Sequence, residues 1–250
     1  MVDVVGRERE RTITVVSVAA TVVAVMLVLA ATDNPVTDLV DRLRGVDGRV
    51  RPAVEAEGGG SYAFLDTQDG GERPVGFDPC REIHYVVNPL GAPDGWQTVV
   101  AEAVATVEDA SGLGFTYDGE TDDRDFDDRV GSFSRAKPVL IGWAEDGEVS
   151  DLADDVAGIG GPTVLTVGRL RGYVSGSVVL DQDVTDSFGD GSDGRALHRA
   201  LLLHELGHLV GLDHVDDPNE LMYPRGISAR GYGPGDLAGL AALGAVPCSR

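Results

Sequence analysis

The chain has 250 residues, of which 42% are hydrophobic and 6% aromatic, so it is long and apolar enough to bury a core. Its formal net charge of −22 would repel nucleic acid and an anionic lipid surface, which argues against a nucleic-acid-binding function. The many acids fit either solubility or calcium binding, and composition alone does not separate these two explanations.

The first distinctive segment is an uncharged apolar run over residues 12–31, long enough to cross a bilayer as a helix. Arg7, Arg9 and Arg11 precede it and favour a cytoplasmic N-terminus over residues 1–11. The run exceeds the apolar core of about 7–15 residues found in cleaved signal peptides. We therefore predict an uncleaved membrane anchor, with secretion after signal cleavage as the alternative. Either interpretation places the remaining chain outside the cytoplasm.

Residues 32–75 are acidic and rich in turn-forming residues, with glycines at 58–60 and 70–71. No long hydrophobic periodicity is present, so the pattern predicts a flexible linker between the anchor and a folded domain over residues 76–250.

The chain contains two cysteines, Cys80 and Cys248. In an exported protein such a pair predicts a disulfide, here between the start and the end of the folded domain, with two unpaired thiols as the alternative.

The folded part opens with alternating apolar residues that predict a strand over residues 82–88. A helix follows, for which Asp94 is the expected N-cap, Gln97 completes a capping box and Gly112 is the expected end.

Further strands are predicted over residues 115–118, 139–143, 163–167 and 173–181, with an acidic loop over residues 120–129. A helix over residues 194–210 comes next and stops at Gly211. A last helix begins near Pro234 and is expected to pack through Leu237, Leu240 and Leu243. Strands early in the domain, one helix among them and helices late predict an α+β fold.

The segment from His204 to His214 carries the chemistry. On a helix, His204 and His208 are four residues apart, so their rings project from one face and can share an ion. Glu205 lies one step round the helix and can reach a water on that ion without being a ligand. Gly211 permits a sharp turn that returns His214 to the same ion.

Three imidazoles are a ligand set that suits zinc, and an open fourth position is typical of a catalytic site. Zinc would lower the pKa of a bound water and polarise a peptide carbonyl. Glu205 would then act as the catalytic base and pass the proton to the leaving amine.

With this motif and the sequence Glu220-Leu221-Met222-Tyr223-Pro224, the chain resembles the metzincin clan of zinc peptidases, and within it the matrixins. The second segment is similar to the Met-turn, in which Met222 would form a hydrophobic floor under the metal. The resemblance implies a twisted mixed sheet, an active-site helix and a C-terminal helix. It also implies a substrate-binding edge strand near residues 163–167 and a specificity pocket walled by residues 224–232.

Structural calcium is also implied by the resemblance. Its candidate ligands are Asp181, Asp183 and Asp186, or the acidic cluster over residues 122–128. The chain departs from many matrixins in two respects. Cys80 lacks the surrounding pattern of a cysteine switch, and an anchor stands where a removable signal might be expected.

Other polar residues near the motif are interpreted as structural. Tyr223 is expected to pack, His198 lies on another helical face, and Asp213 is expected to orient backbone. His84 is expected to be a partly exposed strand residue, and Trp96 and Trp143 are expected in the core.

The sequence thus predicts a zinc endopeptidase that acts on extracytoplasmic proteins or peptides. A catalytically silent zinc-binding module of the cell envelope and a zinc amidase acting on cell-wall peptides are the alternatives.

Overall fold

The computed structural model describes residues 48–249, apart from residues 57, 128, 131–135, 155, 190 and 227–228. The predicted cytoplasmic segment (residues 1–11) and membrane helix (residues 12–31) lie outside the described residues. Within the described part of the chain, no helix combines the length and the apolar character needed to cross a membrane.

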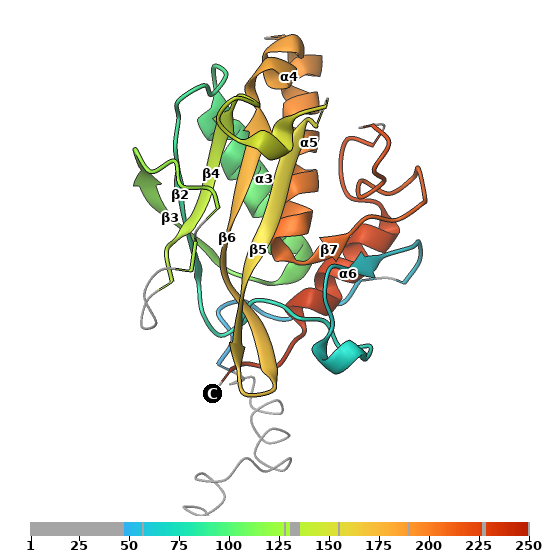
Figure 1. Ribbon diagram of the computed structural model, residues 1–250. Helices are drawn as coiled ribbons and strands as arrows, with labels where there is room; N and C mark the ends of the chain where they lie inside the picture. The colour runs from blue at the N-terminus through green and yellow to red at the C-terminus, as the bar shows by residue number, and fades with distance from the viewer. Residues whose placement is uncertain are drawn as a thin grey trace, which may run out of the picture. The chain divides into compact units, whose positions relative to one another are not determined.

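A mixed five-stranded sheet forms the centre of the folded unit, with the strand order β3-β2-β4-β6-β5 (Figure 1). Four neighbouring strands run parallel: β3 (Phe115–Glu120), β2 (Ile83–Val87), β4 (Val139–Ala144) and β6 (Leu170–Asp181). The edge strand β5 (Gly158–Val167) runs antiparallel to β6. The predicted mixed sheet is therefore confirmed.

Two long helices, α3 (Trp96–Ser111) and α5 (Ser192–Val210), lie side by side against one face of the sheet (Figure 1). The shorter helices are α4 (Gln182–Ser187), which follows β6 directly, and α6 (Pro234–Gly244). A two-stranded sheet pairs β1 (Ala63–Phe64) with β7 (Leu212–Asp213). Two 3₁₀ turns, η1 (Gln68–Gly70) and η2 (Ser150–Leu152), complete the described elements.

Strand β4 is buried on both faces and separates two hydrophobic clusters. Its alternate residues Val139, Ile141 and Trp143 pack in the main core with α3 and α5. Leu140 on the opposite face packs with residues of the β3–β4 loop and η2, chiefly Phe126 and Leu152. The predicted acidic loop therefore also covers the outer face of the sheet.

Both predicted ends of α3 can be compared with the structure. Gly112 ends the helix in a left-handed conformation, with φ of 72°, as predicted. The predicted capping box at Asp94 is wrong: the N-cap is Gly95, with φ of 79° and no side-chain cap. A turn in which Trp96 N–H donates to Pro93 O places Gly95, and not Asp94, at the first turn.

The last helix, α6, begins at Pro234 as predicted, and Leu240 and Leu243 are buried. Leu237 is 39% exposed, so its predicted packing role is wrong. Steps of three residues advance about 300° around a helix, so a row of such positions turns progressively away from the core.

Strands β5 and β6 are longer than predicted, and β5 begins five residues early, at Gly158. The added part of β5 contains Gly158, Gly160, Gly161 and Pro162, which are poor strand formers. They are tolerated because β5 is an edge strand that needs only one pairing partner.

The folded unit begins at Arg49, well before the start at residue 76 that the sequence analysis gives. Ala63 and Phe64 form β1 opposite Asp213 and Leu212, and Val75 N–H donates to Asp66 O. Two residues are too short a strand for periodicity to reveal. The second half of the predicted linker therefore belongs to the folded unit, while residues 32–47 lie outside the described residues.

The predicted disulfide between Cys80 and Cys248 is confirmed, with Cα atoms 5.5 Å apart and a sequence separation of 168. Closing a loop of this length removes conformational entropy from the unfolded chain and contributes about 5 kcal/mol in the chain-entropy model.

A polar contact in the core links the sheet to α5. Trp143 Nε1–H on β4 donates to His198 Nε2 on α5 at 3.2 Å, and both side chains are buried. Trp96 of α3 packs edge-on against Trp143, as expected for core residues. Because the indole N–H only donates, His198 must be neutral here, and burial lowers its pKa to about 4.

This contact predicts a pH dependence of stability. Between pH 6.5 and 4 the unfolded chain binds a proton at His198 that the folded chain does not, so the free energy of unfolding falls as the pH falls. At about 1.4 kcal/mol per pKa unit, the loss is about 3 kcal/mol. Urea unfolding at several pH values should show a shallower dependence in His198→Gln, which keeps an acceptor and cannot titrate. Equal slopes in the two proteins would contradict the assignment.

Candidate metal centre

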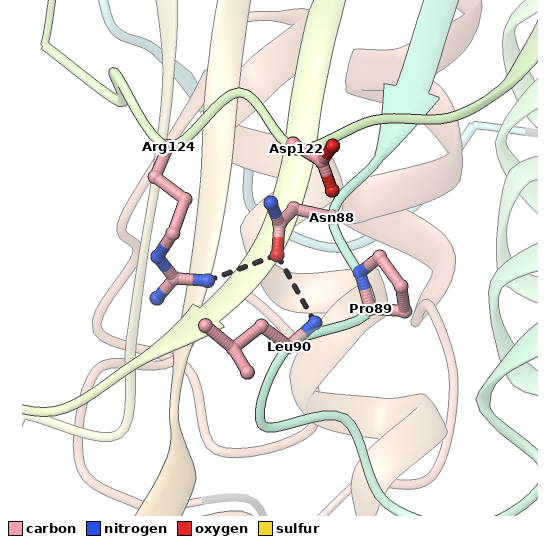
Figure 2. A pocket seen from close by; sticks show the side chains of 5 residues that line it. All are labelled: Asn88, Pro89, Leu90, Asp122 and Arg124. Carbon is pink, nitrogen blue, oxygen red and sulfur yellow. Dashed lines mark hydrogen bonds between the residues drawn. The ribbon is translucent and has the colours of Figure 1, made fainter.

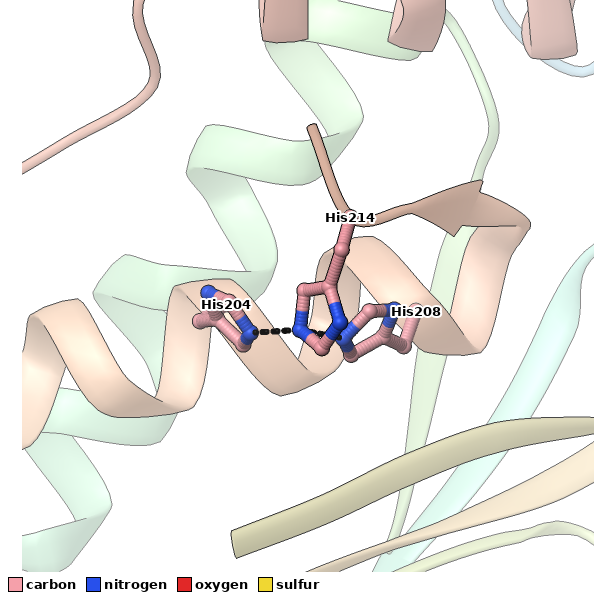
Figure 3. A group of neighbouring side chains, drawn as sticks. All are labelled: His204, His208 and His214. Atoms are coloured by element: carbon pink, nitrogen blue, oxygen red, sulfur yellow. Dashed lines mark hydrogen bonds between the residues drawn. The ribbon is translucent and has the colours of Figure 1, made fainter. Parts of the chain in front are cut away.

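Helix α5 and the turn that ends it bring three histidines together. His204 and His208 are one helical turn apart, so their side chains leave α5 from the same face. The helix ends at Gly211, whose φ of 120° is strained for other residues and whose N–H donates to the carbonyls of Gly207 and His208. The chain then passes through β7 and places His214 beside the other two rings (Figure 3).

The Nε2 atoms of these rings converge on one point. His214 Nε2 lies 3.1 Å from His204 Nε2 and 3.1 Å from His208 Nε2. The three ring nitrogens all lie within 4.8 Å of one another, and Figure 3 shows them facing a common centre. The three side chains that the sequence predicts as ligands are therefore brought together.

Backbone carbonyls determine which ring nitrogen carries the proton in two of the three histidines. His204 Nδ1 is 2.7 Å from Leu221 O, and His208 Nδ1 is 2.8 Å from Leu212 O. A carbonyl oxygen only accepts, so Nδ1 is the donor in each ring and Nε2 presents a lone pair. If His214 Nε2 carried a proton, it could donate to only one of the other two Nε2 atoms, His204 Nε2 or His208 Nε2. A single cation can accept the lone pairs of all three.

The donor set fits zinc. Burial lowers the pKa of all three histidines, to about 4 for His204, and so favours the neutral form that binds metal. Zinc accepts three imidazole ligands and keeps its fourth position for water or substrate in catalytic sites. Ring N–H groups that donate to backbone carbonyls are the usual support of such ligands.

The predicted Met-turn (residues 220–224) lies against the helix turn that carries two of the histidines. Met222 is buried, and a Cβ added to Gly207 would lie 2.7 Å from Met222 Sδ. Val215 N–H, next to the third histidine, donates to Met222 O at 3.1 Å. The same turn supplies Leu221 O, which orients His204.

Two buried carboxylates attach the Met-turn to the start of α6, and we call Glu220 and Asp236 the carboxylate clasp. Glu220 accepts from the N–H of Gly235 at 2.9 Å and of Asp236 at 3.0 Å. Asp236 accepts from the N–H of Leu221 at 2.6 Å and of Met222 at 3.4 Å. Burial raises the pKa of Asp236 to about 6, so its carboxylate is ionised at pH 7 and accepts these bonds. The clasp thus fixes the peptide that orients His204.

Glu205 follows His204 on α5, and it is not one of the three converging groups, His204, His208 and His214, which we call the histidine triad. Its side chain is 4% exposed, and burial raises its pKa to about 8, an effect partly offset by a hydrogen bond from the Gly160 backbone. Strand β5 approaches α5 very closely here: a Cβ added to Gly160 would lie 2.1 Å from Glu205 O. Glycine at this position therefore permits the contact that surrounds Glu205.

The residues set aside in the sequence analysis have the structural roles expected of them. Asp213 Oδ1 accepts from the His214 backbone N–H at 2.7 Å, and the Tyr223 ring lies under the Arg225 guanidinium. His84 is exposed on β2, and its Nδ1 lies 2.9 Å from Asp118 Oδ1. Cys80 is held in the disulfide.

The candidate calcium ligands are partly engaged elsewhere. Asp181 caps α4 by accepting from Val184 N–H at 2.7 Å. In the β3–β4 loop, Asp123 pairs with the buried Arg129, and this lowers the pKa of Asp123. Among the described residues, only the histidine triad and the disulfide region with Asp78 gather three possible ligand groups closely. Calcium binding stays a prediction.

An open pocket at the carboxyl end of β2 is lined by Asn88, Pro89, Leu90, Asp122 and Arg124 (Figure 2). Arg124 points across it and donates to Asn88 Oδ1 at 2.9 Å and to Trp143 O at 2.8 Å, and it also pairs with Glu148. Asn88 Oδ1 also accepts from Leu90 N–H at 3.0 Å. These contacts hold the loop, and none of the triad residues lines the pocket.

Sequence reasoning missed the supporting residues of the centre. Asp236 occupies an ordinary position in the first turn of α6, and Gly160 looks like a loop residue. The acceptor role of Leu221 and Leu212 belongs to their backbone carbonyls, and no residue type signals it. The residues of the zinc motif and of the Met-turn have a recognisable spacing, and Asp236, Gly160 and the two carbonyls do not.

A comparison with protein families found a match between residues 94–230 and the model described as matrixin. The matched region extends from just before α3 to beyond the Met-turn, which is more than half of the chain. No curated protein matched the chain.

The close contact of β5 with α5 predicts a sharp difference between two adjacent glycines. Gly160→Ala would place a methyl group against the Glu205 carbonyl and should lower the free energy of unfolding by about 1–3 kcal/mol. Gly161→Ala is the matched control, since an added Cβ there has nothing within 4 Å. Urea midpoints that fall equally in both variants would contradict the close contact.

The carboxylate clasp predicts a second effect on stability. Asp236→Ala removes the acceptor of the Leu221, Met222 and Gly233 N–H groups, which are buried. Leaving such donors without partners should lower the free energy of unfolding by about 2–4 kcal/mol. Chemical denaturation measures this, with Leu237→Ala on the exposed face of α6 as the control. Equal, small losses in the two variants would argue against the clasp.

Proposed function

Because the chain belongs to the matrixin family of metallopeptidases, we propose that it is a zinc-dependent endopeptidase in which His204, His208 and His214 hold the zinc. Its substrates would be extracytoplasmic proteins or peptides. The observation that carries the proposal is the convergence of three imidazole Nε2 atoms beside the buried Glu205.

In the proposed reaction, Glu205 is the catalytic base; a zinc cation held by the neighbouring histidines would lower the pKa that burial raises and so favour the carboxylate. Zinc, when bound, supplies Lewis acidity toward the scissile carbonyl and the attacking water. One oxygen of the Glu205 carboxylate would take a proton from that water as the water oxygen bonds to the carbonyl carbon, and would pass the proton to the amide nitrogen as the C–N bond breaks and the amine leaves. The contact of Gly158 and Gly160 with Glu205 keeps bulk water away from the side chain on the β5 side.

The edge strand β5 is the proposed binding site for the peptide. Its only neighbour among the described strands is β6, so its outer edge offers backbone groups for an extended chain. The same strand touches Glu205 through Gly158 and Gly160. A peptide paired along β5 would therefore pass close to the proposed base. Residues 224–232 are the proposed wall of the specificity pocket. Within this segment, the Tyr232 hydroxyl donates to Leu203 O on α5 at 2.6 Å.

We also propose that the enzyme works outside the cytoplasm, anchored by residues 12–31 or secreted after their removal. The disulfide between Cys80 and Cys248 supports an oxidising compartment. The silent zinc module and the zinc amidase stay as alternatives. The buried carboxylate of Glu205 favours an enzyme over the silent module, because a structural site has no use for it beside the ligands.

Hydrolysis of casein or of a quenched peptide library by residues 32–250 tests the proposal. We expect cleavage that a zinc chelator abolishes and added zinc restores. Glu205→Gln should lower kcat by about 10²–10⁴-fold, because it removes general acid–base catalysis. The variant should still bind one equivalent of zinc, because Glu205 is not one of the converging groups.

The matched control is Glu145→Gln, which changes an exposed carboxylate and should leave kcat unchanged. One equivalent of zinc with no cleavage of any substrate would support the silent module. Release of peptides from cell-wall fragments, with no action on proteins, would support the amidase. Activity that survives the chelator would overturn the zinc mechanism.

A further inference from the structure

A segment far from the zinc motif in sequence lies against the link that leads to the third histidine. We call residues 61–65 the N-terminal strap. Ala63 pairs with Asp213 and Phe64 with Leu212, and Leu65 N–H donates to Gly211 O at 2.9 Å. Figure 1 shows this short strand, coloured blue-green, beside β7 and α6.

The link that the strap contacts, Gly211 to Asp213, is the whole connection between α5 and His214. It begins at a glycine with φ of 120°, whose N–H caps α5 by donating to Gly207 O and His208 O. Leu212 O within it orients His208 by accepting from Nδ1–H. The path of residues 211–213 therefore determines where the His214 ring lies and how the His208 ring is oriented.

The strap is attached on both sides of its pairing with β7. On the α6 side, its backbone at Ser61 lies so close to Gly235 that an added Cβ there would be 2.2 Å from Ser61 O. Phe64 packs on the main core and lies against Tyr62 in a tilted arrangement, with ring centroids 5.4 Å apart.

Beyond the strap, the chain is fixed to the β5–β6 hairpin. Asp66 pairs with Arg171, and Gln68 Nε2 donates to Arg171 O at 2.6 Å. The β1–β7 pairing is thus held between two anchored ends, so it can restrict the link.

We propose that the N-terminal strap is a positioning element of the metal centre, and that pairing of residues 61–65 with the link from Gly211 to Asp213 strengthens zinc retention. This inference rests on the proposed function. Its consequence is that the N-terminal part of the folded unit supports metal retention, so that release or cleavage of the strap would weaken metal binding. Loss of a group that supports zinc ligands lowers metal affinity by about 10–100-fold.

The test compares Leu65→Pro with Leu65→Ala in the full chain. Proline lacks the N–H that donates to Gly211 O, and it keeps the preceding residue extended, as β1 requires. Alanine removes the same side chain, which is 41% exposed, and keeps the N–H. We expect Leu65→Pro to lose zinc to a chromogenic chelator at least about tenfold faster than wild type. Leu65→Ala should match wild type.

Cobalt substitution provides a readout that general destabilisation would not move. We expect wild type and Leu65→Ala to share the visible absorption of a four-coordinate site, and Leu65→Pro to show a changed spectrum while its far-ultraviolet circular dichroism is unchanged. Equal zinc retention and equal cobalt spectra in all three proteins would overturn the inference. Wild type that binds neither metal would overturn the proposed function itself.

Hydrogen exchange on the wild-type chain keeps the inference testable if Leu65→Pro does not fold. Coupling is reciprocal, so if strap pairing strengthens zinc binding, zinc must strengthen strap pairing by the same factor. We expect added zinc to slow amide exchange in residues 61–65 by about tenfold or more. Exchange in the strap that does not change with zinc would overturn the inference.

Discussion

The central constraint in this protein is that three imidazole Nε2 lone pairs face one point, with two of the opposite ring nitrogens bound to backbone carbonyls. His204 is oriented by Leu221 O and His208 by Leu212 O. Neither carbonyl belongs to α5, so the helix alone cannot orient the rings it carries. The geometry of the centre therefore depends on two loops, and the rest of the structure holds those loops.

Each loop is held by contacts from distant parts of the chain. Glu220 and Asp236 exchange hydrogen bonds between the Met-turn and the start of α6, so the peptide at Leu221 cannot shift without leaving buried donors unpaired. The link after Gly211 pairs with β1. The carboxylate clasp and the pairing of β1 with β7 thus each hold one of the two loops that orient the histidines.

Strand β5 connects this centre to the sheet. Its glycines allow the backbone to touch α5 at Glu205, which is why poor strand formers occupy an edge strand at this position. The same contact desolvates Glu205, and burial raises the pKa of its carboxyl group. The close packing around Glu205 and the raised pKa of its carboxyl group therefore both come from the contact of β5 with α5. A change that loosens this contact alters both.

The sequence by itself predicted the family, the disulfide, most elements and the residues that converge, because these have recognisable patterns: His208 four positions after His204, a glycine at the end of the helix, and one pair of cysteines in an exported chain. Tertiary structure alone decided the carboxylate clasp, the β1–β7 pairing and the contact of Gly160 with Glu205. Periodicity reports which face of an element is buried, and it carries no information about the distant group that a buried carboxylate, carbonyl or two-residue strand will meet.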